Sequence, residues 1–129
     1  MIKIAFVTAA ALLAGCALEP RPLTFEEMAD QKPPKCSGAQ HCAAMWQRAQ
    51  AWVATNSRYK IQIATDVVIQ TYTPTRSSTD LGFTIVREAV APDQYRFITK
   101  AGCDNIFGCM PTRERALAAL HRYMKETPQ

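Results

Sequence analysis

Four cysteines in two copies of one spacing constrain the fold of this 129-residue chain more than any other feature. Cys36 and Cys42 are separated by five residues, and so are Cys103 and Cys109. An even set of cysteines in a small secreted chain is typical of disulfides. Zinc ligands are usually closer, with about two to four residues between them, and no Cys-x-x-Cys redox motif occurs. The pattern therefore predicts two structural disulfides and no metal site.

The repeated spacing favours two local bridges, Cys36–Cys42 and Cys103–Cys109. The alternative joins the two motifs as Cys36–Cys109 and Cys42–Cys103. This alternative pairing stays open because a regular helix through both Cys36 and Cys42 would hold their Cα atoms beyond the limit of about 7 Å for a disulfide, which would prevent the local bridge. A helix that starts nearer Gln40 removes this conflict.

The first sixteen residues, MIKIAFVTAAALLAGC, begin with a lysine at position 3 and continue in a short apolar stretch. This pattern predicts a secretory signal that is too short to span a bilayer permanently. The last four residues, Leu13-Ala14-Gly15-Cys16, resemble the lipobox of bacterial lipoproteins. The resemblance implies that residues 1–15 are removed and that Cys16 is acylated, so that the chain is anchored in a membrane. Ala17, in place of aspartate, implies the outer membrane, with the folded part in the periplasm.

The segment that follows the anchor predicts a spacer. Residues 16–35 combine mixed charges with four prolines, Pro20, Pro22, Pro33 and Pro34. Such a composition is typical of an extended linker rather than packed structure. Phe25 and Met28 allow one apolar helical turn that docks on the body or on a partner. We therefore expect a signal at 1–15, a tether at 16–35 and a single domain at 36–129.

Hydrophobic periodicity predicts the elements of that domain. Apolar residues recur at helical spacing over 40–56 and again after Pro111, and Ser37 with Gln40 has the spacing of a capping box. A period of two over 59–72 predicts one long strand with a bulge near Thr65-Asp66. Residues 82–90 and 94–101 predict a hairpin around Pro92.

Charge pairing sets the register of the hairpin, because opposite charges stabilise a sheet when they face each other across two strands. Glu88 opposite Arg96 is the favoured pairing, and it places Arg87 opposite Phe97. The expected fold is α+β: a three-stranded antiparallel sheet with an N-terminal and a C-terminal helix on one face, in the order α-β-β-β-α.

Charge and motifs exclude several classes of function. Lys and Arg number 15 against 11 Asp and Glu, and this modest excess does not indicate nucleic-acid binding. The two histidines, His41 and His121, lie on the predicted helices, with His121 at the flank of the apolar stripe. No nucleophile elbow, phosphate-binding loop or zinc-protease motif occurs. The sequence therefore predicts neither an enzyme nor a cofactor.

Three side chains are candidates for an interface. Trp52 lies at the rim of the first helix's apolar stripe, where it either packs in the core or anchors a partner. Arg76 lies in the polar loop 73–81, as a solvated or a recognition residue. Arg87 lies on the otherwise apolar face of its strand. It either lays its stem over the ring of Phe97 with its charge in water, or binds a carboxylate of a partner.

Two functions remain after this elimination. The first is an adaptor lipoprotein that binds a larger envelope protein or assembly. The second is an inhibitor or immunity protein against an incoming toxic enzyme, which would present a protruding loop such as 73–81. A small-ligand carrier or enzyme would instead require a deep pocket with convergent polar groups.

Overall fold

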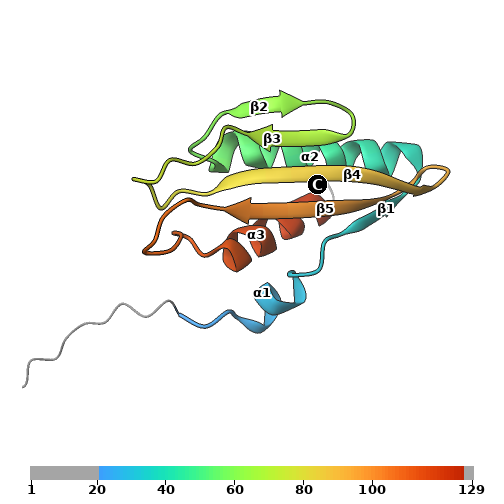
Figure 1. Ribbon diagram of the computed structural model, residues 1–129. Helices are drawn as coiled ribbons and strands as arrows, with labels where there is room; N and C mark the ends of the chain where they lie inside the picture. The colour runs from blue at the N-terminus through green and yellow to red at the C-terminus, as the bar shows by residue number, and fades with distance from the viewer. Residues whose placement is uncertain (1–20, 127–129) are drawn as a thin grey trace, which may run out of the picture.

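Five strands form one antiparallel sheet in a computed structural model that describes residues 21–126. The predicted signal and Cys16 lie outside the described residues. Along the sheet the strands are β1 (Lys35–Ser37), β5 (Gln94–Gly102), β4 (Gly82–Ala91), β3 (Val68–Thr71) and β2 (Ile61–Ala64). Helices α2 (Ala39–Asn56) and α3 (Arg113–Lys125) lie on one side of the sheet, and the short helix α1 (Phe25–Ala29) lies beside α3 (Figure 1).

The predicted three-stranded sheet is wrong, and a turn at Thr65 is the first reason. The Thr65 hydroxyl accepts hydrogen bonds from the backbone N–H groups of Val67 at 3.1 Å and Val68 at 3.0 Å. These bonds reverse the chain, so the segment predicted as one bulged strand forms the β2–β3 hairpin. Residues alternate in polarity on both sides of the turn, and the alternation therefore concealed it.

Strand β1 is the second reason. It contains three residues only and pairs with the far edge of β5, with Cys36 opposite Tyr95. A strand this short carries no measurable periodicity, and Lys35 fell within the expected tether. Cys36 is buried, whereas its two neighbours in the strand are exposed.

Both predicted local disulfides are confirmed. Cys36 bonds to Cys42 with the Cα atoms 5.1 Å apart, and Cys103 bonds to Cys109 with the Cα atoms 5.7 Å apart. The first bridge is possible because α2 begins only after Gly38, whose φ of 92° suits a residue without a Cβ. The helix therefore starts from Gly38 rather than from the expected capping box at Ser37.

The predicted hairpin register is also confirmed. In the pairing of β4 with β5, Glu88 lies opposite Arg96 and Arg87 lies opposite Phe97. Glu88 and Arg96 form an ion pair on the sheet face that the helices leave open. The turn contains Asp93 with a φ of 52°, a conformation that aspartate tolerates better than most residues.

The core lies between the sheet and the two long helices. Its fully buried large side chains come from both layers: Met45, Val53, Ile69, Ile85, Leu120 and Met124. Each such side chain contributes about 1.5–3 kcal/mol when it leaves water, so this layer contributes most of the apolar burial that stabilises the fold. Among residues 21–126, no helix is both long enough and apolar enough to cross a membrane.

Candidate functional site

Arg87 is the most unusual polar side chain of the folded body. Its guanidinium lies over the ring of Tyr95 at 4.8 Å and over the ring of Trp46 at 5.3 Å. Its Nε is buried and has no hydrogen-bond partner within the described part of the chain. The ion pairs found among residues 21–126 do not include Arg87. A half-buried cation is thus held by aromatic rings rather than by an opposite charge.

Three elements hold this arrangement in place. Alternate residues of β4 face the helices, and Phe83 and Ile85 precede Arg87 on that face. Trp46 is fixed from α2 because its indole Nε1 donates to the carbonyl oxygen of Thr65 at 3.1 Å. The same indole stacks on Phe97, with the ring centroids 6.2 Å apart. The Trp46 ring is therefore held in place by contacts within the described chain.

A hollow of about 550 Å³ lies beside Arg87, and we call it the arginine hollow. It is lined by Asp66, Val67, Val86, Arg87, Glu88, Ala89, Tyr95 and Ile98. The ladder between β3 and β4 ends at Val68 and Val86, so β4 continues past the start of β3. The hollow opens at this uncovered edge, where Glu88 is already engaged by Arg96.

Guanidinium chemistry indicates which class of ligand would suit this hollow. Arginine presents a planar fork of N–H donors that matches a carboxylate with two parallel hydrogen bonds. A buried polar group without a partner is unfavourable, and stacking on aromatic rings offsets only part of that cost. The arrangement therefore suits an incoming carboxylate. Asp66 is the one carboxylate of the lining that is not in an ion pair found among residues 21–126.

Trp52 and Arg76 lie elsewhere, at the end of the sheet where the segments 72–81 and 103–112 meet. We call this region the loop end. The Met110 N–H donates to the carbonyl of Thr79 at 3.0 Å, which ties the two segments together. The Arg76 side chain is 93% exposed and forms an ion pair with Asp104 at 3.5 Å. Arg76 is therefore a surface residue that joins the two segments.

The Trp52 side chain packs in part against the core. Its ring meets Phe83 edge-on with the centroids 5.4 Å apart, and the side chain is half-buried. It also lines a hollow of about 420 Å³ between the end of α2 and the start of α3, with Met110, Pro111 and Arg115. The structure thus brings Trp52 and Arg76 to the same end of the molecule and separates both from Arg87.

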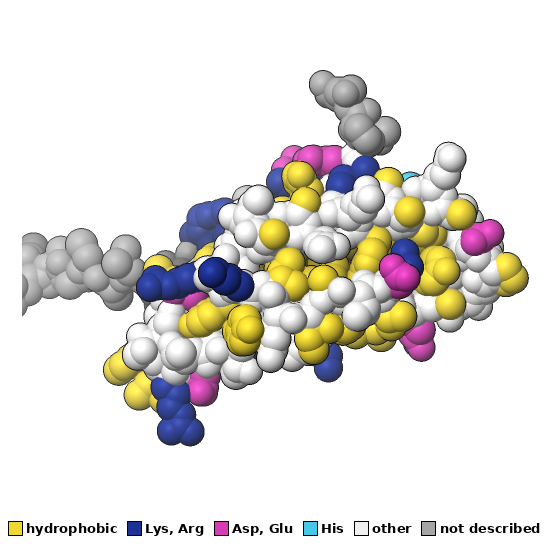
Figure 2. All heavy atoms as spheres, turned by 90° about the horizontal axis from the view of Figure 1, so that it is seen from above, with side chains coloured by type: hydrophobic (Ala, Val, Ile, Leu, Met, Phe, Trp, Pro, Cys, Tyr) yellow, Lys and Arg dark blue, Asp and Glu magenta, His cyan; other side chains and the backbone are white. Residues whose placement is uncertain are grey.

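The loop end carries two exposed hydrophobic residues that the sequence analysis missed. Ile106 is 94% exposed and Phe107 is 89% exposed, within the loop that the Cys103–Cys109 disulfide closes. Figure 2 shows a band of hydrophobic side chains along the middle of one face, with several Lys and Arg side chains toward the left. In the sequence, the exposed residues Ile106 and Phe107 were indicated only by an Ile-Phe pair in a short polar segment between two cysteines.

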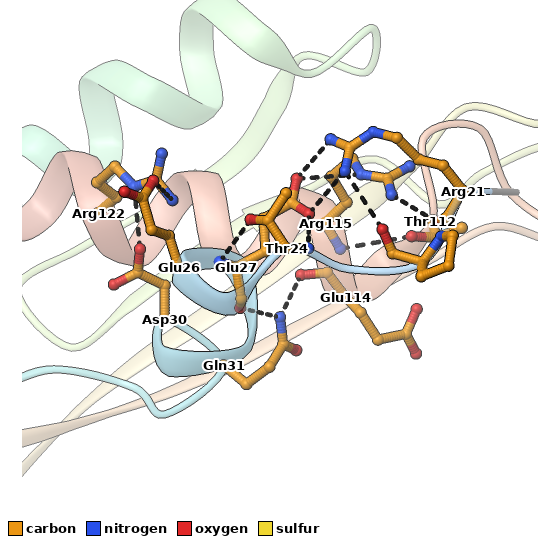
Figure 3. A network of polar contacts seen from close by, with 11 residues as sticks. Arg21, Thr24, Glu26, Glu27, Asp30, Gln31, Thr112, Glu114, Arg115 and Arg122 are labelled. Carbon is orange, nitrogen blue, oxygen red and sulfur yellow. Dashed lines mark hydrogen bonds and ion pairs between the residues drawn. The ribbon is translucent and has the colours of Figure 1, made fainter.

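A polar network fixes the first described residues against α3 (Figure 3). Glu27 accepts hydrogen bonds from Arg21 at 2.8 Å and from Arg115 at 3.2 Å. The hydrogen bond from Arg21, followed by the backbone N–H of Thr24, lowers the pKa of Glu27 to about 2. Asp30 accepts from Arg122 at 2.9 Å and also from Lys125. Residues 21–35, expected as an extended spacer, thus pack in part on the body.

His121 is fully buried rather than at the flank of its stripe. Its Nδ1 lies 2.6 Å from the carbonyl oxygen of Asp30, so Nδ1 carries the proton that is donated there. Its Nε2 then accepts from the Thr99 hydroxyl at 2.7 Å. Burial, which removes water from the charged form, lowers the pKa of His121. The ring therefore links α3 to the strand β5 and to α1 in its neutral form.

His41 lies on the exposed first turn of α2, with Nδ1 3.3 Å from the carbonyl oxygen of Ser37. Within residues 21–126, no three His, Cys, Asp or Glu side chains gather in a way that could hold a metal ion.

Comparisons with protein-family models, with curated proteins and with solved structures give no match.

Proposed function

We propose that this chain is a small cell-envelope lipoprotein that binds a larger envelope protein and carries out no catalysis of its own. Acyl chains on Cys16 anchor it, in the outer membrane, with the folded body in the periplasm. Arg87 binds an acidic group of the partner. The observation that supports this proposal is the half-buried guanidinium over two rings, with a buried Nε that lacks a partner among the described residues.

The energetics favour a carboxylate of the partner over a neutral group. A hydrogen bond to a charged group contributes about 1.5–3 kcal/mol, which exceeds the contribution of a neutral one. Trp46 and Tyr95 already restrict the guanidinium, so little conformational entropy is lost on binding. The open edge of β4 beside Ala89 gives an extended acidic segment a path to Arg87.

Asp66 makes the site selective among anions. As a carboxylate at the lining of the hollow, it repels an incoming acidic group and thereby limits weak binding of unrelated anions. Replacing it by asparagine keeps the shape and removes the charge. We therefore expect Asp66→Asn to tighten binding of the partner and Arg87→Met to weaken it.

In-cell photocrosslinking tests the proposal. A photoreactive residue placed at Ala89, which is exposed and lines the hollow, should capture one envelope protein. The matched control is Ala51, an exposed alanine on α2 that lies outside the hollow. Capture at position 89 should be lost with Arg87→Met and with Cys16→Ala, which removes the anchor.

The captured protein is then purified and titrated against the lipoprotein. Removing one partner of a buried charge pair costs about 2–5 kcal/mol, so Arg87→Met should raise Kd about 30-fold or more. Arg87→Lys keeps the charge but loses the fork of donors, and it should restore only part of the affinity. Equal affinity of the unaltered chain and Arg87→Met would refute the proposal.

A further inference from the structure

We infer that the loop end faces the membrane and that Ile106 and Phe107 insert into the lipid interface beside the anchor. The inference rests on the proposed acylation of Cys16. The occupant of this surface is the bilayer itself, in contrast to the acidic protein segment proposed for the arginine hollow.

The first step is the place where the chain reaches the body. The backbone carbonyl of Arg21 accepts a hydrogen bond from Nη2 of Arg115 at 2.9 Å. Figure 3 shows Arg21, Arg115 and Thr112 together at the start of α3. Arg115 also lines the hollow at the loop end, with Met110 and Pro111. The described chain therefore begins at the start of α3, which directly follows the segment that carries Ile106, Phe107 and Met110.

The second step is the reach of the chain between the anchor and this point. Four residues lie between Cys16 and Arg21, and the five Cα–Cα steps that join them span at most about 18 Å when fully extended. Glu27 binds both Arg21 and Arg115, so the network of Figure 3 fixes Arg21 at the start of α3. The lipid is therefore held within a short distance of the loop end.

The third step is the chemistry of the exposed surface. Ile106, Phe107 and Met110 are 94%, 89% and 71% exposed, and the first two lie at the tip of a disulfide-closed loop. Large apolar side chains on a restrained loop lose little entropy on insertion and gain the removal of their surface from water. Such exposure is unfavourable in a protein that stays in water, and it marks an interaction surface.

The fourth step is charge. Arg76 is exposed and lines a hollow with Ile106 and Phe107, and Arg113 is exposed at the first residue of α3. Arginine side chains near an apolar insertion are attracted to anionic lipid headgroups. Asp104 pairs with Arg76 and offsets part of this attraction. Strand β4 leads from the loop end to Arg87, which places the arginine hollow away from the lipid and open to a partner.

Quenching by brominated lipid tests the inference on the full lipoprotein, purified with its anchor. The protein is reconstituted into vesicles of phosphatidylethanolamine and phosphatidylglycerol that carry brominated acyl chains. Phe107→Trp reports the loop end, and Val90→Trp, also exposed but at the far hairpin turn, is the matched control. The unaltered chain supplies the background signal of Trp46 and Trp52. We expect Phe107→Trp to lose most of its added fluorescence and Val90→Trp to keep it.

Hydroxyl-radical footprinting of the unaltered chain in the same vesicles gives a second measurement that needs no variant. Phe107 is more exposed than Tyr123, which is 38% exposed near the other end of α3. In vesicles, Phe107 should nevertheless be oxidised more slowly than Tyr123. Oxidation in proportion to exposure, or equal quenching of the two tryptophan variants, would overturn the inference.

Two controls separate this inference from the proposed function on which it rests. Mass spectrometry detects acyl chains on Cys16, and flotation detects membrane attachment. A protein that carries the acyl chains and floats, but shows an unprotected Phe107, refutes the membrane contact alone. A protein without acyl chains that does not float refutes the proposed anchor itself.

Discussion

His121 should make the stability of this protein fall as the pH decreases from 7.5 to 5.0. The side chain is fully buried, donates from Nδ1 to the Asp30 carbonyl and accepts at Nε2 from Thr99. Burial lowers its pKa in the folded state below the ordinary value of 6.5. The unfolded chain therefore binds a proton at pH values where the folded protein does not. Stability contributed by the neutral ring is fully present above pH 6.5 and is lost as the pH falls below that value.

The size of this effect follows from proton linkage. One proton bound only by the unfolded state gives a slope of at most about 1.4 kcal/mol per pH unit. If His121 stays neutral in the folded state, the free energy of unfolding decreases by at most about 2 kcal/mol between pH 7.5 and 5.0. Asp30 and Glu27 have lowered pKa values, so their contributions to stability are lost only at more acidic pH.

Urea unfolding at several pH values between 7.5 and 5.0 measures the slope. His121→Asn keeps a donor near the position of Nδ1 and removes the titrating group, so its stability should change much less over this range. His41→Gln removes an exposed histidine and should leave the slope in place. Direct titration of the His121 ring by NMR gives an independent value. Equal slopes for the unaltered chain and His121→Asn would refute the reasoning.

Two further predictions concern the body. A Cβ at Gly82 would lie 2.9 Å from Cδ and Cγ of Pro74, so Gly82→Ala should destabilise the protein by about 1–3 kcal/mol in urea unfolding. Gly102 lies directly opposite in the hairpin and a Cβ there meets nothing within 4 Å, so Gly102→Ala should be tolerated, and equal losses would contradict the close approach to Pro74. Removing the Cys103–Cys109 bridge by a double replacement with serine should reduce the free energy of unfolding by about 2 kcal/mol, the entropy expected for a loop this short. A loss much larger than this, measured in the same way, would mean that the bridge also positions α3.

Local patterns predicted the parts of the fold whose partners are close in sequence. Glu88 and Arg96 specify the β4–β5 register because a two-strand hairpin offers few alternatives. The local disulfides follow from the repeated spacing, because each pair closes a loop of five intervening residues. The two long helices follow from apolar residues at 3.6-residue spacing.

Other elements depend on contacts that no local pattern contains. The turn at Thr65 is closed by the Thr65 hydroxyl, which accepts from Val67 and Val68, and by the backbone N–H of Thr65, which donates to the Val68 carbonyl; the alternating sequence indicates neither contact. Strand β1 exists because β5 offers a free edge and because Cys36 bonds to Cys42. Helix α1 has five residues, and it is held by Glu27 and Asp30, whose partners lie about ninety residues further along the chain.

For the candidate sites too, the sequence indicated single residues, and the tertiary structure decided their surroundings. The sequence indicated Arg87, because a charged residue interrupts an apolar face, but it did not reveal that Trp46 and Tyr95 hold the guanidinium. It indicated Trp52 and Arg76 separately, and only the packing of segments 72–81 and 103–112 brought them to one end, where Arg76 lines a hollow with Ile106 and Phe107.

By itself, the sequence determined the two long helices, the hairpin register and the two local disulfides, since each depends on residues within about twenty positions of one another. The tertiary structure alone decided the number of strands, the burial of His121 and the surroundings of Arg87. The physical reason is that the free energy of these features comes from surfaces and hydrogen bonds that meet only after the sheet and helices pack. A local pattern specifies which side chains are apolar enough to be buried, and the packing of the sheet and helices determines which of them are buried.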